Sequence, residues 1–583
     1  ILELGMSEME RRFKQREPEQ RSGSPLGADL TDDDDDSRVL IAPTSRSSGV
    51  SARDSRCKVL CLLATVVLGT VLVSHALRNE WSSVAVLYAV TWNIAAINNN
   101  PFEYWITHND KDYNALMEAV QHFIDDPKSR DVPVSQVFSQ SMWMELKELM
   151  IERGWDGIEQ TDKLWRTDFS SRKIISEFMQ DKTLGDKRLA SMPDRYTNTI
   201  NTIDTGVVNR PTVINCFDGD MTSVQKWWSQ WKFFMFKKSL HLTSGSKGPL
   251  VVEPVGMLSK IKKSKYPAIT ADEEAISIPL QTLALAIFDA VLIHVVNSVS
   301  PNGKWQVLQR QMCEALNRRK DEHTINILTS YSEATVIFLQ ETASSFISKA
   351  AKSVLGERYQ IIVSESLDGK RDQNSLILLS KAFFRASSVK ELTGTVLGSF
   401  AHSVPVSNGD LLVISAEDVL GRQYLLASFH GDTNGLATLP VLAAVHKLAT
   451  SMPTHRLIFG QDANTYETGS ISQQGVTEFA ADFVSKGYSS CWGDFPNPKA
   501  HTTFNARTFL QAQLQKAARV DEMITRGDKN PKDFILFSKS GFSLISAAKD
   551  NTGKRKYVDD MVFPTLDFPS DHGLVMTKLR LLG

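Results

Sequence analysis

The chain has 583 residues, of which 42% are hydrophobic and 23% are charged, and its formal net charge is -2 at pH 7. This composition is typical of globular proteins, and the length predicts two to four domains. The near-zero net charge argues against a processive nucleic-acid binder, although it leaves room for a local basic groove.

The five cysteines follow no recognisable pattern. Cys57 and Cys61 lie at the apolar segment described below, and Cys216, Cys313 and Cys491 are far apart in the chain. We therefore expect no disulfide framework and no zinc site.

Residues 1–56 are rich in Ser, Arg, Asp and Glu, with an acidic run at Asp32–Asp36. Because no helical or strand periodicity is present, the sequence predicts a disordered tail. The acidic run also argues against a mitochondrial or plastid transit peptide.

An apolar segment follows at 58–78, KVLCLLATVVLGTVLVSHALR. Its roughly 19 uncharged residues would span about 28 Å as a helix, close to the hydrocarbon thickness of a bilayer. We expect a single-pass membrane anchor, with a buried core helix as the alternative. The basic residues before the segment predict a cytoplasmic tail and a C-terminal part on the other side. The chain has no N-x-[ST] glycosylation site after residue 78, so the sequence does not decide on which side of the membrane the C-terminal part lies.

The first predicted strand lies at 82–97, and a long, mainly helical region occupies 98–325. Within this region, 280–296 is apolar enough to suggest a second membrane span. That span would place Asp289 and other polar side chains in lipid, so we expect a buried helix instead.

The segment 224–242, VQKWWSQWKFFMFKKSLHL, mixes Trp and Phe with Lys. Our first expectation is a helix packed inside the helical region. The alternatives are an interfacial helix on the bilayer, because Trp and Lys suit the headgroup layer, and a stacking surface for single-stranded nucleic acid.

From about residue 333 the pattern changes to short apolar runs separated by Gly, Asn, Asp and Ser, for example TVIFLQE, NSLILLS, DLLVISA, YLLASFH, HRLIFGQD and KDFILFS. Amphipathic helices are expected at about 436–451 and 474–486. Many strands with a few helices predict an α/β fold in which two packed mixed sheets are flanked by helices, spanning 333–583 together with the first strand.

Several predicted strands begin or end at a polar residue suited to metal or phosphate chemistry. The set is Asn93, Glu341, His430, Asp462, Asn464, Asp533, Asp571 and His572. One such residue alone is usually a turn residue. The repetition at many strand termini predicts a site at one edge of the sheets.

The residue types in this set indicate a reaction class. Carboxylates with an Asn carbonyl are hard oxygen ligands that suit Mg²⁺, with Mn²⁺ as an alternative. His430 and His572 remain to move protons or to stabilise charge. The chain has neither a G-x-S-x-G elbow nor a P-loop. Metal-assisted hydrolysis of a phosphoester fits best.

The order of these motifs resembles the endonuclease/exonuclease/phosphatase superfamily. The pieces are TWN ending at Asn93, FLQE ending at Glu341, the strand-borne His430, D-x-N at 462–464, Asp533 opening a late strand, and SDH at 570–572. The resemblance covers about 82–97 and 333–583. It implies a four-layer α/β sandwich with the site at one edge of the paired sheets.

The resemblance also implies which residues hold the metal. Asn93 and Glu341 would hold Mg²⁺, and Asp571 would assist the metal or the leaving oxygen.

The remaining residues would act on the substrate. Asp462 would orient and activate the attacking water, and Asn464 would bind phosphate oxygens. His572 would contact the phosphate and stabilise developing negative charge, with Asp533 fixing its orientation. His430 would be a second phosphate contact.

Three further residues match the family pattern less closely. Asn374, in DQNSLILLS, falls where the family often places another polar contact with the substrate. Thr503 and Phe504, in HTTF, resemble the stretch that commonly precedes the strand with the family's late Asp.

The sequence departs from the family pattern in two ways. GQDAN has one residue more between Gly460 and Asp462 than the family's G-D-x-N, and the whole helical region separates Asn93 from Glu341. A second hypothesis follows from these departures, namely a catalytically silent binding or scaffold protein that acts through its helical insertion.

No stretch identifies the substrate, which leaves nucleic acid, a nucleotide or a phospholipid headgroup. FPSDH resembles the ending of deadenylase and nocturnin-like members. About six residues link the expected anchor to the first strand, and they reach only about 20 Å. The folded part should therefore lie near the bilayer, which keeps a lipid-linked phosphoester among the candidates.

Overall fold

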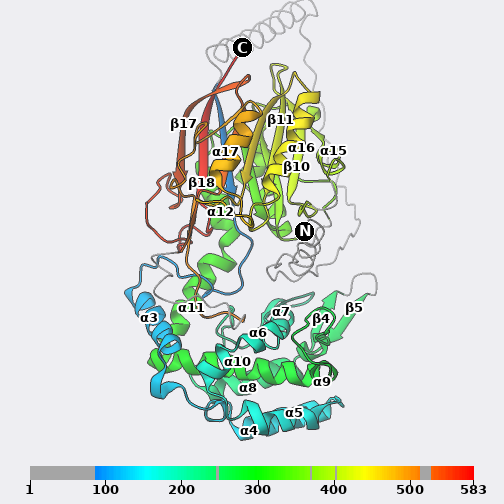
Figure 1. Cartoon of the computed structure of the whole chain (residues 1–583), viewed down its shortest axis with the longest axis vertical. Helices are drawn as coiled ribbons and strands as arrows, with labels where there is room; N and C mark the ends of the chain where they lie inside the picture. Colours follow the sequence, from blue (N-terminus) through cyan, green and yellow to red (C-terminus); the bar gives the residue numbers. More distant parts are fainter. Residues whose placement is uncertain (1–85, 244–247, 368–370, 401–403, 513–526) are drawn as a thin grey trace, which may run out of the picture.

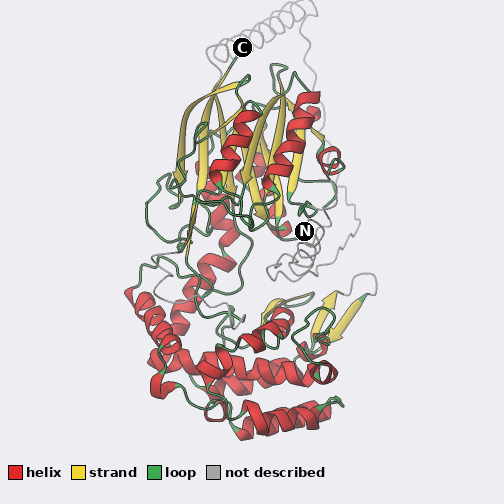
Figure 2. Cartoon of the chain, viewed as in Figure 1, coloured by secondary structure: helices red, strands yellow, loops and turns green. Residues whose placement is uncertain are grey.

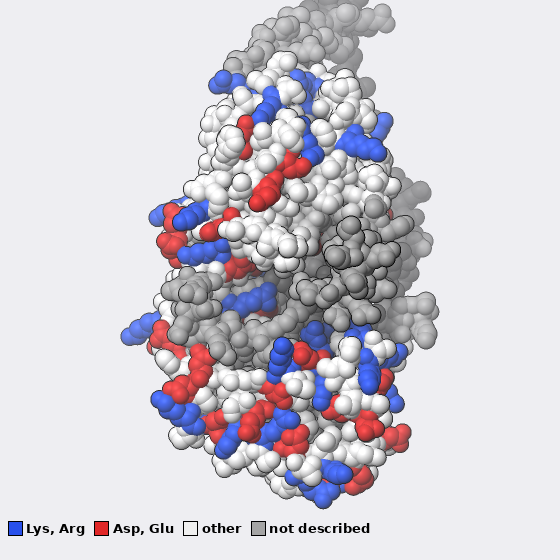
Figure 3. All heavy atoms as spheres, in the orientation of Figure 1, with Lys and Arg blue, Asp and Glu red and all other residues white. Residues whose placement is uncertain are grey.

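The computed structural model describes residues 86–243, 248–367, 371–400, 404–512 and 527–583. These residues form a β-rich lobe and a helical lobe, joined through helices α11 (Lys304–Cys313) and α12 (Lys320–Ser330) (Figures 1 and 2). On the face drawn in Figure 3, Lys and Arg side chains are interspersed with Asp and Glu. The expected tail at 1–56 and the expected anchor at 58–78 lie outside the described residues.

The β-rich lobe contains two six-stranded mixed sheets. In the first sheet the strand order is β17 (Phe542–Asp550), β18 (Leu574–Leu581), β1 (Val86–Asn93), β6 (Val336–Thr342), β8 (Asn374–Ser380) and β7 (Tyr359–Ile362). In the second it is β13 (Tyr488–Ser490), β16 (Asp533–Ser538), β12 (Arg456–Asp462), β11 (Gln423–His430), β10 (Leu411–Glu417) and β9 (Lys390–Glu391). The expected α/β class with two packed mixed sheets is confirmed.

Helices cover the outer face of each sheet, which gives four layers. Along β6, Val336 and Phe338 enter the core between the sheets, whereas Ile337 and Leu339 enter the core on the helix side. The first sheet is covered by α12 (Lys320–Ser330), α13 (Ser344–Ala351) and α14 (Val354–Arg358). The second is covered by α16 (Thr438–Ser451) and α17 (Val476–Ser485).

Gly460 explains how closely the sheets approach each other beside the site. A Cβ atom at this position would lie 2.4 Å from the Phe338 ring of the facing sheet. Any larger residue would push the sheets apart two residues before Asp462.

The helical lobe lies between β1 and β6 in the sequence. Its helices are α3 (Lys111–Asp125), α4 (Gln140–Glu152), α5 (Ile158–Leu164), α6 (Lys182–Asp186), α7 (Ser191–Thr197), α8 (Val224–Lys237), α9 (Ala271–Ala275), α10 (Ser277–Val299) and α11 (Lys304–Cys313). Two hairpins, β2 (Thr199–Thr202) with β3 (Gly206–Asn209) and β4 (Leu240–Thr243) with β5 (Pro249–Val252), complete it.

Helix α10 is the central element of this lobe and contacts α3, α4, α5, α7 and α8. Among the described residues it is the one helix long and apolar enough to cross a membrane by length and composition, but 78% of its most apolar window is buried inside the protein. This burial favours the expected core helix over a second membrane span.

The aromatic helix α8 is also packed inside the lobe. Trp227, Trp228 and Trp231 are buried and lie in contact with one another, and Phe233 is the exposed aromatic residue. The packed-helix interpretation therefore holds, and these tryptophans are not a surface for bilayer or nucleic acid.

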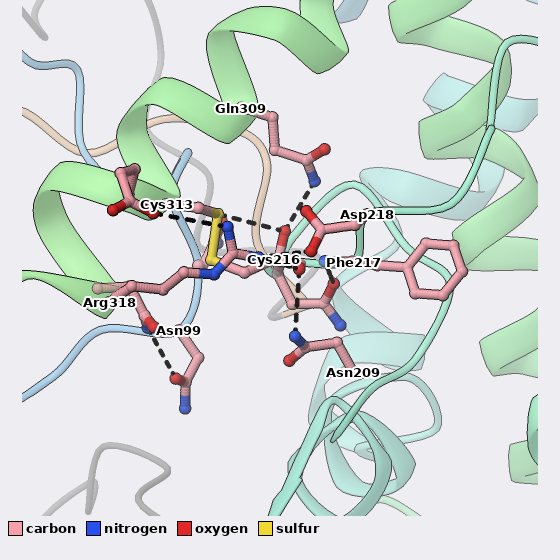
Figure 4. The surroundings of a disulfide bond; sticks show 12 residues. Asn99, Asn209, Cys216, Phe217, Asp218, Gln309, Cys313 and Arg318 are labelled. Atoms are coloured by element: carbon pink, nitrogen blue, oxygen red, sulfur yellow. Dashed lines mark hydrogen bonds and ion pairs between the residues drawn. A yellow bond between two sulfur atoms is a disulfide. The ribbon is translucent and has the colours of Figure 1, made fainter. Parts of the chain in front are cut away.

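The expectation of no disulfide was wrong. Cys216 and Cys313 form a disulfide whose Cα atoms are 5.6 Å apart (Figure 4). Sequence spacing gave no signal here because the cysteines are 97 positions apart, and the intervening chain folds into the lobe and returns α11 to the loop that carries Cys216.

Candidate active site

The topology brings the predicted residues to one edge of the sandwich. Parallel strands β1 and β6 run to this edge, where β1 ends at Asn93 and Glu341 is the penultimate residue of β6. Parallel strands β11 and β12 end there with His430 and Asp462. Antiparallel β16 begins at the same edge with Asp533, directly opposite Asp462. Strand β18, antiparallel to β1, is preceded there by the SDH turn. This edge of the sandwich faces the helical lobe (Figure 1).

Four side-chain nitrogens converge on one carboxylate oxygen, Oδ2 of Asp462. The distances are 2.9 Å from Asn93 Nδ2, 3.4 Å from Asn464 Nδ2, 3.6 Å from His430 Nε2 and 3.7 Å from His572 Nε2. Asp462 is itself fully buried. At this edge, the Asp462 carboxylate is therefore surrounded by two side-chain amides and two imidazoles.

Glu341 lies beside this centre because the end of β6 is bulged. The register between β6 and β8 shifts between Leu339 and Thr342, and Glu341 takes a left-handed φ of +51°. Its Oε1 lies 3.2 Å from Asn93 Nδ2 and 3.4 Å from His430 Nε2. A left-handed glutamate is strained by about 1–3 kcal/mol, a feature that is concentrated at functional sites.

His572 forms a dyad with Asp533. Its Nδ1 lies 3.1 Å from Asp533 Oδ2, so its Nε2 points toward Asp462. Burial disfavours the imidazolium, but the Asp533 and Asp462 carboxylates outweigh burial and raise the pKa of His572 to about 10.

Burial also raises the pKa of Asp533, so its carboxylate and the His572 imidazole compete for one proton. The Thr502 hydroxyl donates to Asp533 Oδ2 at 2.6 Å. Because this hydrogen bond stabilises the carboxylate, we place the proton on His572.

Asn464 and Asp571 lie at the same edge. Asn464 has a φ of +48°, and its Nδ2 also donates to Gly431 O at 2.9 Å. Asp571 is buried, and its Oδ2 accepts from Asn505 Nδ2 at 3.2 Å.

Asn374 has a supporting position. Its Nδ2 donates to the backbone oxygens of Thr342 and Arg371 at 2.9 and 2.7 Å, next to the bulge that carries Glu341. In this structure its amide therefore holds the bulge, and its assignment as a substrate contact stays a prediction.

Two sets of side chains could hold a cation. Asp462, Asp533 and His572 have ligand atoms within 4.8 Å of one another. However, His572 Nδ1 is already engaged by Asp533, which suits a proton-holding dyad better than a metal ligand. Glu341 offers a buried carboxylate that fits Mg²⁺. Asn93 offers its buried Oδ1, which accepts from Ala95 N at 2.9 Å. The Nδ2 of Asn93 faces Glu341 and Asp462.

The sequence interpretation missed residues that hold the site in shape. Thr502 rather than its neighbour Thr503 contacts Asp533. Ser570 of the SDH turn donates to Asn93 O at 2.6 Å and accepts from His572 N at 3.0 Å. The Trp92 indole donates to His572 O at 2.8 Å. Each adjoins a residue of the predicted set, and that adjacency was the available signal.

Comparisons with known proteins give a family match for the helical lobe only. A domain of unknown function, DUF8234, matches residues 131–310, from before α4 into α11. No curated protein matches the chain.

Several solved structures match slightly less than half of the chain. The human Nocturnin catalytic domain with bound sulfate is 14% identical and has a TM-score of 0.30, with 45% of this chain and 87% of that one covered. An endonuclease/exonuclease/phosphatase from Bacteroides vulgatus is 13% identical with a TM-score of 0.32, covering 46% and 92%. TDP2 from C. elegans is 17% identical with a TM-score of 0.29, covering 45% and 71%. At such low identity and TM-score, the function has to be argued from the site.

Proposed function

We propose that this protein is a Mg²⁺-dependent hydrolase that cleaves a phosphoester by attack of water. The observation that carries the proposal is the convergence of four nitrogens from distant segments on Asp462 Oδ2, with Glu341 beside it. A buried carboxylate among imidazoles and amides can accept a proton from water and hold an anionic phosphate nearby.

The residues divide the reaction between them. Asp462 accepts a proton from the attacking water, whose oxygen forms the new bond to phosphorus while the bond to the leaving oxygen breaks. The His572 imidazolium, held by Asp533, donates from Nε2 to a phosphate oxygen, and His430 donates to another. Asn464 orients the phosphate, and Asp571 assists at the leaving oxygen. Glu341 and Asn93 would hold a Mg²⁺ ion, which when bound would supply Lewis-acid stabilisation of the developing charge.

The direction of β1 favours a water-soluble phosphoester over a lipid headgroup. Strand β1 starts at Val86, opposite Arg580 near the C-terminal end, and finishes at Asn93 in the site (Figure 1). Its eight residues cover about 26 Å at roughly 3.3 Å each. A membrane anchor at 58–78 would therefore hold the site away from its own bilayer, in reach of nucleic acid or nucleotides.

The disulfide supports an oxidising compartment for the folded part. Disulfides persist outside the cytosol and are rare within it. The Cys216–Cys313 bond therefore agrees with a cytoplasmic tail, a membrane anchor at 58–78 and a non-cytoplasmic catalytic part. Protease protection of the C-terminal part in sealed vesicles tests this topology, and complete digestion without detergent would contradict it.

The test of the activity is hydrolysis of bis(p-nitrophenyl) phosphate and p-nitrophenyl phosphate by the full chain in detergent. We expect Mg²⁺-dependent turnover that EDTA abolishes and that His572→Ala lowers by at least about 100-fold. His446→Ala is the matched control, because His446 lies on α16 against Tyr488. Equal turnover by wild type and His572→Ala would refute the proposal.

The silent scaffold remains the competing hypothesis. The insertion does match a family model of its own. A silent relative would have no need to retain both imidazoles, both carboxylates and a strained Glu341 at one edge. We therefore favour the enzyme.

A further inference from the structure

The helical lobe reaches the candidate site through one short segment. Residues 314–320, which we call the docking turn, comprise a π-helical turn, Glu314–Arg318, and the first residue of α12. The docking turn faces residues 94–100, the β1 loop, which directly follows Asn93. π-helical turns are rare and occur frequently at functional sites.

Two side chains of the docking turn hold the β1 loop. Lys320 Nζ donates to Ala96 O at 3.1 Å. Asn317 Nδ2 lies 3.2 Å from Asn98 O and 3.1 Å from Asn99 Oδ1. The docking turn thus fixes the loop at three residues, Ala96, Asn98 and Asn99.

The same loop holds the predicted metal ligands from its other side. Ala96 N donates to Glu341 Oε2 at 3.0 Å, and Ala95 N donates to Asn93 Oδ1 at 2.9 Å. Ala95 has a φ of +53°, an unfavourable conformation that the loop must be held in. Ala96 therefore connects Lys320 to Glu341 through one residue of backbone.

The burial of Lys320 is hard to explain by packing alone. The residue is only 4% exposed and lines a cavity of about 40 Å³ together with Asn98 and Asp571. Burying an ammonium group is unfavourable unless polar partners hold it. An apolar side chain would fill the same space at lower cost, so the charge itself has a use there.

The docking turn is itself anchored firmly in the helical lobe. Cys313, the residue before it, is disulfide-bonded to Cys216. Arg318 Nη2 donates to Asp218 Oδ2 at 2.7 Å and lies 3.4 Å from Cys216 O (Figure 4). Figure 4 places Asn99 of the β1 loop beside this group. Because the docking turn is anchored in the helical lobe, it can hold the β1 loop in one conformation.

We propose that Lys320 is a positioning residue through which the inserted lobe sets the affinity of the site for its divalent cation. The inference rests on the proposed function and adds to it a task for the insertion. Lys320 keeps the β1 loop in the strained conformation that aims Asn93 and Glu341, without touching the substrate. Loss of its ammonium group weakens cation binding more than it slows turnover at saturating metal.

Direct Mn²⁺ binding to the full chain in detergent, measured by electron paramagnetic resonance, tests the inference without depending on activity. Lys320→Met retains the stem and removes the charge, and we expect about a tenfold weaker Mn²⁺ affinity. At saturating Mn²⁺, turnover should change less than threefold. Hydrogen exchange in peptides covering 94–100 should become faster.

The control is Lys349→Met, which removes an ion pair to Asp321, the neighbour of Lys320 on α12, at 2.7 Å. It should leave Mn²⁺ affinity unchanged. Asn317→Ser is a second variant in case Lys320→Met folds poorly, and it should weaken Mn²⁺ binding in the same direction. Unaltered affinity in both docking-turn variants would overturn the inference alone. Failure of the wild type to bind Mn²⁺ would instead overturn the proposed function as well.

Discussion

Each lobe has a fully buried aspartate, Asp289 in the helical lobe and Asp462 at the edge of the sandwich, and the two have different surroundings. In the helical lobe, Asp289 on α10 receives Arg210 Nε at 2.8 Å, Thr212 Oγ1 at 2.7 Å and Trp231 Nε1 at 2.9 Å. In the β-rich lobe, Asp462 is surrounded by amides and imidazoles, and no described Lys or Arg pairs with it within 4.0 Å.

The difference separates structural burial of charge from functional burial. The Asp289 carboxylate is already paired with the Arg210 guanidinium, so it needs no further cation. We call this group the closed network. The centre around Asp462 combines carboxylates with left-handed φ values at Ala95, Glu341 and Asn464. Strained backbone and clustered ionisable side chains are concentrated at functional sites, so we interpret the centre around Asp462 as a binding site.

The largest expected effect on turnover comes from neutralising Asp462. We call the group of side chains around Asp462 the open centre, because no Lys or Arg pairs with it among the described residues. Asp462→Asn should lower phosphoesterase turnover by about 100- to 10,000-fold, because it removes the proton acceptor for water. The melting temperature should change little, because the variant removes the cost of burying a carboxylate together with its attraction to the His572 imidazolium, 3.7 Å away. Turnover on bis(p-nitrophenyl) phosphate and calorimetry check the two expectations.

Asp482→Asn is the matched control, because Asp482 on α17 pairs with Lys486, the residue that follows the helix. A large fall in the melting temperature of Asp462→Asn, with no such fall in the control, would mean that Asp462 is structural and would remove the contrast with Asp289.

Breaking the closed network should lower stability strongly and turnover only slightly, the reverse of the effect expected for Asp462→Asn. Arg210→Met leaves Asp289 buried without its cation, which typically destabilises by about 3–5 kcal/mol. The melting transition of the helical lobe should fall, whereas turnover per folded molecule should fall much less than in Asp462→Asn. Adding Asp289→Leu to Arg210→Met should recover much of the loss, and failure to recover would show that the ion pair is not what the single variant breaks.

The disulfide should stabilise the helical lobe rather than the β-rich lobe. Cys216→Ser with Cys313→Ser opens a 97-residue loop, and loss of such a bond typically costs about 2–4 kcal/mol. The melting temperature of the helical lobe should fall, while that of the β-rich lobe should stay the same. Equal shifts in both transitions would indicate that the lobes unfold as one unit.

The strand pattern made the β-rich lobe predictable from sequence. Alternation along segments such as 336–342 encodes which side chains face the other sheet, and the polar strand ends then fall at one edge. Asn93 could be grouped with Glu341 because both terminate apolar runs, even with the insertion between them.

Features that depend on three-dimensional return of the chain were not predictable. The Cys216–Cys313 bond and the contact of Lys320 with Ala96 both arise because the insertion folds back to its starting point. Local sequence has no signal for that closure. The bulge at Glu341 is equally hidden, because its residues continue the strand composition.

The smallest expected effect tests directly whether the open centre takes a cation. A ligand that binds only the folded protein stabilises it by mass action, so Mg²⁺ at ten times its dissociation constant should contribute about 1.4 kcal/mol. The shift should appear in the transition of the β-rich lobe and be absent from that of the helical lobe, where Arg210 already occupies the equivalent place. Glu341→Gln should remove most of the shift, because an amide oxygen is a weaker ligand for Mg²⁺ than a carboxylate. If Mg²⁺ stabilised wild type and Glu341→Gln equally, the cation would bind elsewhere, and Glu341 would owe its left-handed backbone to something other than metal binding.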